Sequence, residues 1–380
     1  MPQSQQPVLQ KLFYSLLLIM LLVSCTAESE PVSVAELPGL ELDYLFTVSE
    51  SDDLLLGSIT YVLTDSEGNM IISDMQQRTI HAVDAEGNYI QQIGGRGSGP
   101  GEFQFPGILT LGSDDTLQLL DWGTRKVNSY RKENGRWIFD TDFIADFSET
   151  GFFSSLHADA DGHLAVAASP TAFDAEGGKT VIKRLNSHGE VVSDSILAYP
   201  PPERFTIMQD GMPRMSMTNP LMHRQGRFHV DLAGNYYYGW TDSLYIERKR
   251  YDEVDFKPYL HFDMPKREFT SAIADSLENS MSSMLEDNNQ ARRDLRASFP
   301  AHVPAFSTLM ADDMGYLWVS VFDEAGRPEW IIFDDDGQPV FKTTLPERHR
   351  LGALRHGRAY LIAVDEFDLP IVKVMAYSYR

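Results

Sequence analysis

The sequence repeats one kind of tight turn, in which an aspartate stands about three residues before a glycine. The turns occur at Asp65–Gly68, Asp84–Gly87, Asp159–Gly162, Asp231–Gly234, Asp312–Gly315 and Asp334–Gly337. An aspartate side chain accepts hydrogen bonds from the amides of such a turn, and glycine adopts the left-handed backbone conformation that closes it. A chain interrupted so regularly is predicted to consist of many short antiparallel strands.

Apolar runs of strand length lie between these turns, for example Met70–Ser73, Leu117–Leu120, Tyr236–Tyr238 and Leu317–Val321. They alternate with polar residues or are apolar throughout, as strands that are half or fully buried do. A unit of four such strands recurs about every 40–50 residues once two insertions are set aside, which is the period of propeller blades. The six predicted units are about 57–95, 106–146, 154–197, 225–264, 302–346 and 352–380. The predicted fold is all-β, a six-bladed β-propeller with four-stranded antiparallel blades.

The last unit supplies fewer strands than the others. A lone strand pattern, Glu41–Val48, precedes the first unit. We expect this N-terminal strand to take the missing outer place and to close the last blade. Closure removes the exposed edges that an open array of sheets would present.

A glycine-rich run from Gly94 to Gly101 connects the first two units, with Pro100 and Pro106 at its exit. A phosphate-binding loop of this composition needs a helix directly after it, because the N-terminal amides of that helix bind the phosphate. The residues that follow, Gly107–Leu111, have a strand pattern instead. The run is therefore predicted to be a connector between repeated β units.

The N-terminus has the pattern of a secretion signal, since Lys11 precedes an apolar run, Leu12–Val23, that is too short to span a bilayer comfortably. The run ends in Leu-Val-Ser-Cys, which resembles the bacterial lipobox. Its Cys25 is the only cysteine, so no internal disulfide can form. The resemblance implies that Cys25 becomes the lipidated first residue of the mature protein. It also favours the outer membrane (periplasmic side or surface), because Thr26 stands where aspartate signals inner-membrane retention in some bacteria.

These patterns predict three segments: a signal peptide over residues 1–24, a lipidated polar tether over 25–40 and the propeller over 41–380. The formal net charge is −23, from 55 acidic and 32 basic residues. Nucleic acid is not an expected partner, because neutralising phosphates requires a basic face. A solvated acidic surface explains the charge, and cation binding is the alternative.

Two insertions interrupt the repeat. The first, Pro200–Met222, is rich in proline and methionine and lacks periodicity. The second, residues 266–298, is predicted to be helical, because apolar residues from Phe269 to Leu285 recur at helical spacing. We expect that apolar stripe to dock on the propeller. A partner-binding or membrane-surface helix is the alternative, although its acidic polar face disfavours anionic lipid.

Strand direction alternates within a blade, so the connections alternate between the two faces of the ring. The glycine-rich connector, both insertions and the joins between second and third strands share one face, which we call the long-loop face. The Asp/Gly turns share the other, the short-turn face. Binding residues concentrate on long loops held by a rigid scaffold. The candidate binding residues on the long-loop face are Arg96, Trp122, Arg125, Arg224, Trp240 and His302. Arg96, Arg224 and His302 come from blade-to-blade joins, where arginine could hold a carboxylate or a sugar acid.

Two aspartates near the ends of second strands have a predicted structural role. In Asp74-x3-Arg78 and Asp121-x3-Arg125, the acid is expected to accept loop amides and the arginine to bridge neighbouring blades. A ring of polar groups around the mouth of the channel is the alternative.

No common catalytic motif is present: the sequence lacks G-x-S-x-G, H-E-x-x-H, C-x-x-C and a phosphate loop. The ten histidines are scattered, and the closest pairs lack an evident third metal ligand. The Asp159-x-Asp161-Gly162 turn lacks the ligand run ending in glutamate that calcium loops carry, so it is predicted to be a plain turn. We predict no catalytic residue, metal site or cofactor, with a divalent cation as the open alternative.

Three segments, Gly94–Phe105, Gly315–Gly337 and Asp365–Val374, resemble the NHL/TolB-like six-bladed propeller lipoproteins of Bacteroidetes and related bacteria. The resemblance covers nearly all of the mature chain and implies the fold and a lipid-anchored place in the cell envelope. The first repeat departs from the pattern, since Asp74 to Arg78 lacks the usual asparagine, which puts a shared ligand role in doubt.

Two functions stay open. One is a non-enzymatic, membrane-anchored module that binds a small molecule, a glycan or a protein through the long-loop face. The other is an enzyme resembling six-bladed lactonases or lyases, with a divalent cation on the propeller axis. The enzyme would require at least three Glu, Asp, Asn or His side chains within reach of one cation at the channel.

Overall fold

The computed structural model describes residues 34–147, 151–169, 178–209, 212–217, 223–281, 285, 289–323 and 327–379. The chain divides into a unit of residues 1–36, whose described part is the 3-10 helix η1 (Val34–Glu36), and a compact unit of residues 37–380. The predicted signal peptide and Cys25 therefore lie outside the described residues. Within the described ranges, no helix is both long and apolar enough to cross a membrane.

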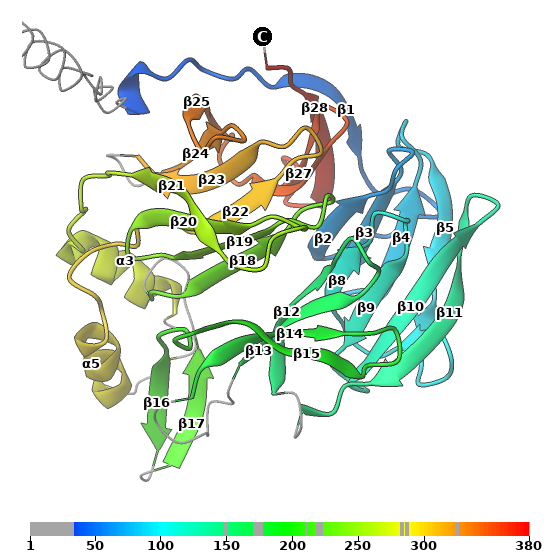
Figure 1. The fold of residues 1–380 in the computed structure, drawn as a ribbon, viewed down its shortest axis with the longest axis horizontal. Coiled ribbons are helices and arrows are strands. Elements are labelled where there is room, and N and C mark those ends of the chain that lie inside the picture. Colours follow the sequence, from blue (N-terminus) through cyan, green and yellow to red (C-terminus); the bar gives the residue numbers. More distant parts are fainter. Residues whose placement is uncertain are drawn as a thin grey trace, which may run out of the picture. The chain divides into compact units, whose positions relative to one another are not determined.

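Residues 37–380 form a ring of six four-stranded antiparallel sheets, as predicted (Figure 1). Blade 1 contains β2 (Ile59–Thr64), β3 (Met70–Asp74), β4 (Thr79–Val83) and β5 (Tyr89–Ile93). Blade 2 contains β8 (Pro106–Leu111), β9 (Leu117–Asp121), β10 (Lys126–Glu133) and β11 (Arg136–Ile144). Blade 3 contains β12 (Phe152–Ala158), β13 (Leu164–Ser169), β14 (Thr180–Leu185) and β15 (Val191–Tyr199).

The other three blades continue the ring. Blade 4 contains β18 (Gly226–Val230), β19 (Tyr236–Trp240), β20 (Leu244–Lys249) and β21 (Lys257–Phe262). Blade 5 contains β22 (Thr308–Ala311), β23 (Leu317–Phe322), β24 (Pro328–Phe333) and β25 (Pro339–Thr344). Blade 6 contains β26 (Arg350–Arg355), β27 (Arg358–Val364), β28 (Pro370–Ala376) and β1 (Asp43–Val48). The strands β2, β8, β12, β18, β22 and β26 contact one another in sequence around the ring, so these inner strands surround the axis.

The N-terminal strand closes the ring, as predicted. β1 pairs antiparallel with β28 as the outer strand of blade 6, with Val48 opposite Val372. Val48 is 2% exposed and belongs to an apolar cluster that also contains Val62 of blade 1 and Tyr360 of blade 6. The first and last parts of the propeller sequence thus share one core.

The six predicted turns have the expected geometry. Asp65 illustrates them, since its Oδ1 accepts the backbone N–H groups of Glu67 at 2.9 Å and Asn69 at 2.8 Å. The glycines that close these turns have φ between 75° and 96°. A residue with a Cβ rarely adopts this conformation, so glycine is required there.

The two insertions pack against each other. The first contains an antiparallel hairpin that the sequence did not indicate, β16 (Phe205–Gln209) with β17 (Met212–Met217), and the second contains α3 (Ser271–Ser280) and α5 (Asn289–Ala297) (Figure 1). Their apolar cluster contains Leu277 and Leu295 of the helices and Phe205 of the hairpin. The prediction of helix was confirmed. The prediction that the stripe docks on the propeller was wrong, because the described members of this cluster come from the two insertions and from Phe299, directly after the second one.

Candidate functional site

The two aspartates at the ends of second strands hold connecting loops, as predicted. Asp121 is fully buried and accepts the backbone N–H groups of Gln104 at 3.0 Å and Phe105 at 2.7 Å. It also accepts the N–H of Gly123 and the hydroxyl of Thr124. The Asp121 carboxylate therefore attaches the connector that leads into blade 2 to β9, the second strand of that blade.

Asp74, likewise buried, accepts the N–H groups of Gly57, Ser58 and Gln77. The arginine that follows it bridges two blades, because the Arg78 guanidinium stacks 4.1 Å from the ring centroid of Phe105. Arg125 has a different role. Its side chain is exposed, and its backbone bonds to Asp121 and Ala145 hold the turn.

The other predicted binding residues do not converge on one site. Arg96 is exposed on β6 (Gly95–Arg96), which pairs with β7 (Glu102–Phe103) in the glycine-rich connector. Arg224 forms an ion pair with Glu203 at 2.6 Å, which raises its pKa and neutralises its charge. Trp240 is half-buried and packs against an apolar cluster between blades 3 and 4.

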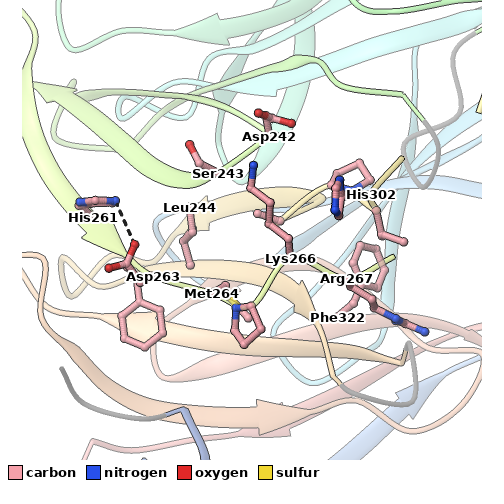
Figure 2. A pocket seen from close by; sticks show the side chains of 15 residues that line it. Asp242, Ser243, Leu244, His261, Asp263, Met264, Lys266, Arg267, His302 and Phe322 are labelled. Carbon is pink, nitrogen blue, oxygen red and sulfur yellow. Dashed lines mark ion pairs between the residues drawn. The ribbon is translucent and has the colours of Figure 1, made fainter. Parts of the chain in front are cut away.

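His302 lines a small pocket of about 130 Å³ between blades 4 and 5 (Figure 2). Figure 2 shows the side chain of Lys266 between those of Ser243 and His302. Small-molecule sites usually enclose about 300–1,000 Å³. This pocket is too small for such a ligand.

A larger cavity of about 410 Å³ lies on the long-loop side, where the inner strands of blades 3 and 4 begin. We call it the long-loop cavity. It is lined by Tyr61, Ile108, Trp122, Phe152, Phe153, Ser154, Ser155, Ala167, Ser169, Thr180, Tyr199, Pro202, Arg204, Gln225, Gly226, Arg227 and Phe228. Trp122 is the predicted binding residue that lies here.

The described lining of the long-loop cavity carries two arginines, Arg204 and Arg227, and no carboxylate. Arg227 is half-buried, and its Nε is buried without a hydrogen-bond partner. Burial lowers the pKa of Arg227 to about 10, because the charged form loses hydration. In a chain of net charge −23, two arginines in a described lining without a carboxylate make this cavity locally basic.

A row of hydroxyl groups crosses the wall that blade 3 contributes. The Ser169 Oγ lies 3.1 Å from the Ser154 Oγ and 3.0 Å from the Thr180 Oγ1. These side chains come from three adjacent strands of one sheet. The Ser155 Oγ is buried without a partner in the same lining. The wall therefore offers hydrogen-bonding groups to a polar ligand.

Aromatic rings form the other walls. Trp122 is 47% exposed, and a Cβ on Gly107 would lie 2.9 Å from its ring. A Cβ on Gly226 would lie 2.4 Å from the ring of Tyr199. The sequence thus places glycine at two points where an aromatic ring lies directly on the backbone.

A second cavity, of about 310 Å³, lies on the axis toward the short-turn ends of the inner strands. We call it the axial cavity, and residues of all six inner strands line it. It shares Tyr61, Ile108, Ser154 and Ser155 with the long-loop cavity, so the two adjoin.

Metal-ligating side chains do not converge on the described part of the axis. His157, His229 and Asp231 line the axial cavity, but the Asp231 carboxylate accepts the N–H and side-chain amide of Asn235. Among the described residues, the group with three ligand atoms in reach of one ion is Asp159, Asp161 and His163. Arg184 pairs with both of these aspartates and offsets one of their two negative charges. The Asp159 carboxylate also accepts the backbone N–H groups of Asp161 and His163, as the aspartates of the other Asp/Gly turns do.

The two axial histidines are neutral at physiological pH. Their ring centroids are 5.7 Å apart, and the Nε2 of His229 accepts the N–H of Ala311 at 3.2 Å. Burial lowers the pKa of His157 to about 3 and that of His229 to about 4. Both values lie below the unfolded value of about 6.5.

The propeller is therefore expected to lose stability as the pH falls below about 6.5, because only the unfolded chain then protonates these histidines. For His157, the loss between pH 7.5 and pH 5.0 is about 2 kcal/mol. Urea unfolding of the wild-type protein and of a His157→Leu variant at the two pH values measures this effect. The loss of stability between pH 7.5 and pH 5.0 should be smaller in the variant by that amount. An equal loss in the two proteins would contradict a neutral His157.

Arg227, Arg204 and the hydroxyl row were not predicted from the sequence. One signal was present: Arg227 and His229 alternate within a strand that the repeat assigns to the innermost place of blade 4. The innermost strand of a blade borders the channel, so a charged residue in that strand is expected near the channel. The hydroxyl row depends on the register of three strands and had no local signal.

Comparison with known proteins supports the fold. Residues 42–155 match the family DUF5128, described as a 6-bladed beta-propeller. A solved structure of a Bacteroides fragilis protein described as exported is similar with a TM-score of 0.56 and 14% identity, over 90% of this chain and 96% of that one. A member of the DUF4221 family from Bacteroides vulgatus has a TM-score of 0.51 and 11% identity, over 90% and 99%.

A gluconolactonase from Xanthomonas campestris has a TM-score of 0.45 and 11% identity, over 90% of this chain and 96% of that one. This likeness is too slight to bear on function. No curated protein matches the sequence.

Proposed function

The chain is a six-bladed β-propeller similar to those of Bacteroides, and we propose that it is a non-enzymatic binding module whose long-loop cavity takes a small carboxylated ligand. The observation that carries this proposal is the half-buried guanidinium of Arg227, which faces no carboxylate among the described lining residues. Burying a charge without a partner costs free energy. A carboxylate ligand would offset that cost by forming two parallel hydrogen bonds with the arginine.

The remaining lining narrows the class of ligand. Ser155, the hydroxyl row and the Gln225 side chain offer hydrogen bonds, and Trp122 offers an exposed ring face. A carboxylated monosaccharide has groups for all three surfaces: an acid for arginine, hydroxyls for the polar wall and a ring face for the indole. A volume of about 410 Å³ lies within the usual range for small-molecule sites.

The N-terminal pattern supports a lipid anchor for this module. In the proposal, residues 1–24 direct export, Cys25 carries the lipid, and the segment to residue 40 holds the propeller at the outer membrane. The similarity to a Bacteroides protein described as exported agrees with an extracytoplasmic location.

The alternative, a lactonase-like or lyase-like enzyme with an axial cation, receives less support from the described residues. The axial cavity offers two histidines and one aspartate that is already hydrogen-bonded to Asn235 and Tyr237. Its wall is otherwise largely aliphatic. An axial cation would therefore lack the charged oxygen ligands that hard divalent ions prefer.

Calorimetric titration of the mature protein with glucuronate, galacturonate and their neutral hexoses tests the proposed function. We expect at least one of the acids to bind, and the matching hexose to bind at least tenfold more weakly. An Arg96→Gln variant is the control and should bind the acid as the wild-type protein does, because Arg96 is an exposed arginine outside the cavity. Equal binding of acid and hexose, or no binding of either acid, would contradict the proposal.

A further inference from the structure

We propose that the axial cavity is a second binding site, adjoining the first, which takes an aliphatic monocarboxylate and holds its carboxylate at Arg355. Arg355 is the last residue of β26, at the short-turn end of the axis. This site lies beyond the long-loop cavity described above, and it uses a different arginine.

The wall of the axial cavity is largely aliphatic. Leu63, Leu111, Leu156, Leu232, Met310 and Leu354 contribute to it. They come from all six blades. Such a wall favours an alkyl chain, since each buried methylene strengthens binding about fourfold. A volume of about 310 Å³, near the lower end for small-molecule sites, favours a slender chain.

Arg355 supplies an incompletely satisfied charge at this wall. It is 8% exposed, and its Nη1 donates to the Thr64 carbonyl oxygen at 2.6 Å. The Arg355 Nε is buried without a partner. The Arg355 side chain forms no ion pair with the residues that the structure describes. A buried guanidinium in this state can donate hydrogen bonds from its remaining N–H groups to a carboxylate.

The other polar groups at the cavity do not compensate Arg355. The Asp231 carboxylate is bonded to Asn235 and Tyr237. The Nε2 of His157 is buried without a partner. A carboxylate held at Arg355 would neutralise the charge, and its chain would cover the aliphatic wall.

Calorimetric titration of the mature protein with butyrate, hexanoate, octanoate and octanol tests this inference. We expect octanoate to bind, with affinity rising about fourfold per methylene along the acid series. Octanol, which lacks the charge, should bind at least tenfold more weakly. Arg355→Gln should weaken octanoate binding at least tenfold. Leu232→Trp, which fills the cavity and retains the arginine, should also weaken it.

Arg358→Gln is the matched control, because the Arg358 Nη1 donates to the Ala85 carbonyl oxygen, also in blade 1, without lining the cavity. It should leave octanoate binding unchanged. The inference is overturned if wild-type protein does not bind octanoate, or if both arginine variants lose binding equally. It is also overturned if Arg227→Met, rather than Arg355→Gln, abolishes binding. Glucuronate binding that survives Arg355→Gln keeps the proposed function independent of this result.

Discussion

Replacement of Asp121 by alanine is expected to lower the free energy of unfolding by about 3–5 kcal/mol. The carboxylate is 0% exposed and accepts N–H groups from both sides of its strand end, among them Gln104, Phe105 and Gly123. Alanine would leave several of these donors buried without an acceptor. The connector between blades 1 and 2 would then lose its attachment to β9. Urea unfolding followed by fluorescence measures the change.

Asp84→Ala is the control for this prediction. Asp84 also accepts two backbone N–H groups, from Glu86 and Asn88, but it lies in an exposed turn. Water can replace the lost acceptor there, so the expected loss is about 1 kcal/mol or less. Equal losses for the two variants would show that burial of Asp121 does not determine its contribution.

Replacement of Arg227 by methionine is expected to weaken binding of the carboxylated ligand about 30-fold or more, because a buried charge pair loses one member. The same change should raise the free energy of unfolding of the ligand-free protein by about 1–2 kcal/mol. The reason is that a guanidinium without a carboxylate partner among the described residues is replaced by an apolar side chain of similar length. Calorimetry and urea unfolding of one preparation measure both effects.

Arg224→Met is the matched control, three residues earlier in the chain. Arg224 is paired with Glu203 at 2.6 Å, so its loss should give no gain in stability. Replacement of Arg227 is therefore expected to raise the free energy of unfolding, whereas replacement of Arg224 is not. If Arg227→Met destabilised the free protein and left ligand binding intact, Arg227 would be a structural residue.

The sequence predicted those parts of the fold that local chemistry determines. The Asp/Gly turns, such as Asp65–Gly68, depend only on residues within the turn. Together with the apolar runs between them, they predicted strands grouped into six units. The closure by β1 followed from counting strands in the last unit. The structural role of Asp121 followed from its position after a strand and before a polar break.

The candidate site could not be predicted in the same way, because it depends on contacts between distant residues. Trp122 and Arg227 are far apart in the sequence, and the ring of blades brings them to one cavity. Arg224 had the right residue type and the right loop, but Glu203 from the other end of the insertion neutralises it. Pairing with a distant residue leaves no local signal.

The docking of the second insertion was misjudged for a related reason. Its apolar stripe correctly indicated a helix with one buried face. The partner of that face includes Phe205, which lies in the other insertion, where no periodic pattern marked a strand. Periodicity identifies a face that needs covering, and it does not identify what covers it.

The most direct test of the proposed function is a crystal structure of the mature protein with bound glucuronate or galacturonate. We predict electron density for the sugar in the long-loop cavity, with its carboxylate within hydrogen-bonding distance of the Arg227 guanidinium. Density at the His302 pocket or beside Arg96, with an empty long-loop cavity, would contradict this assignment.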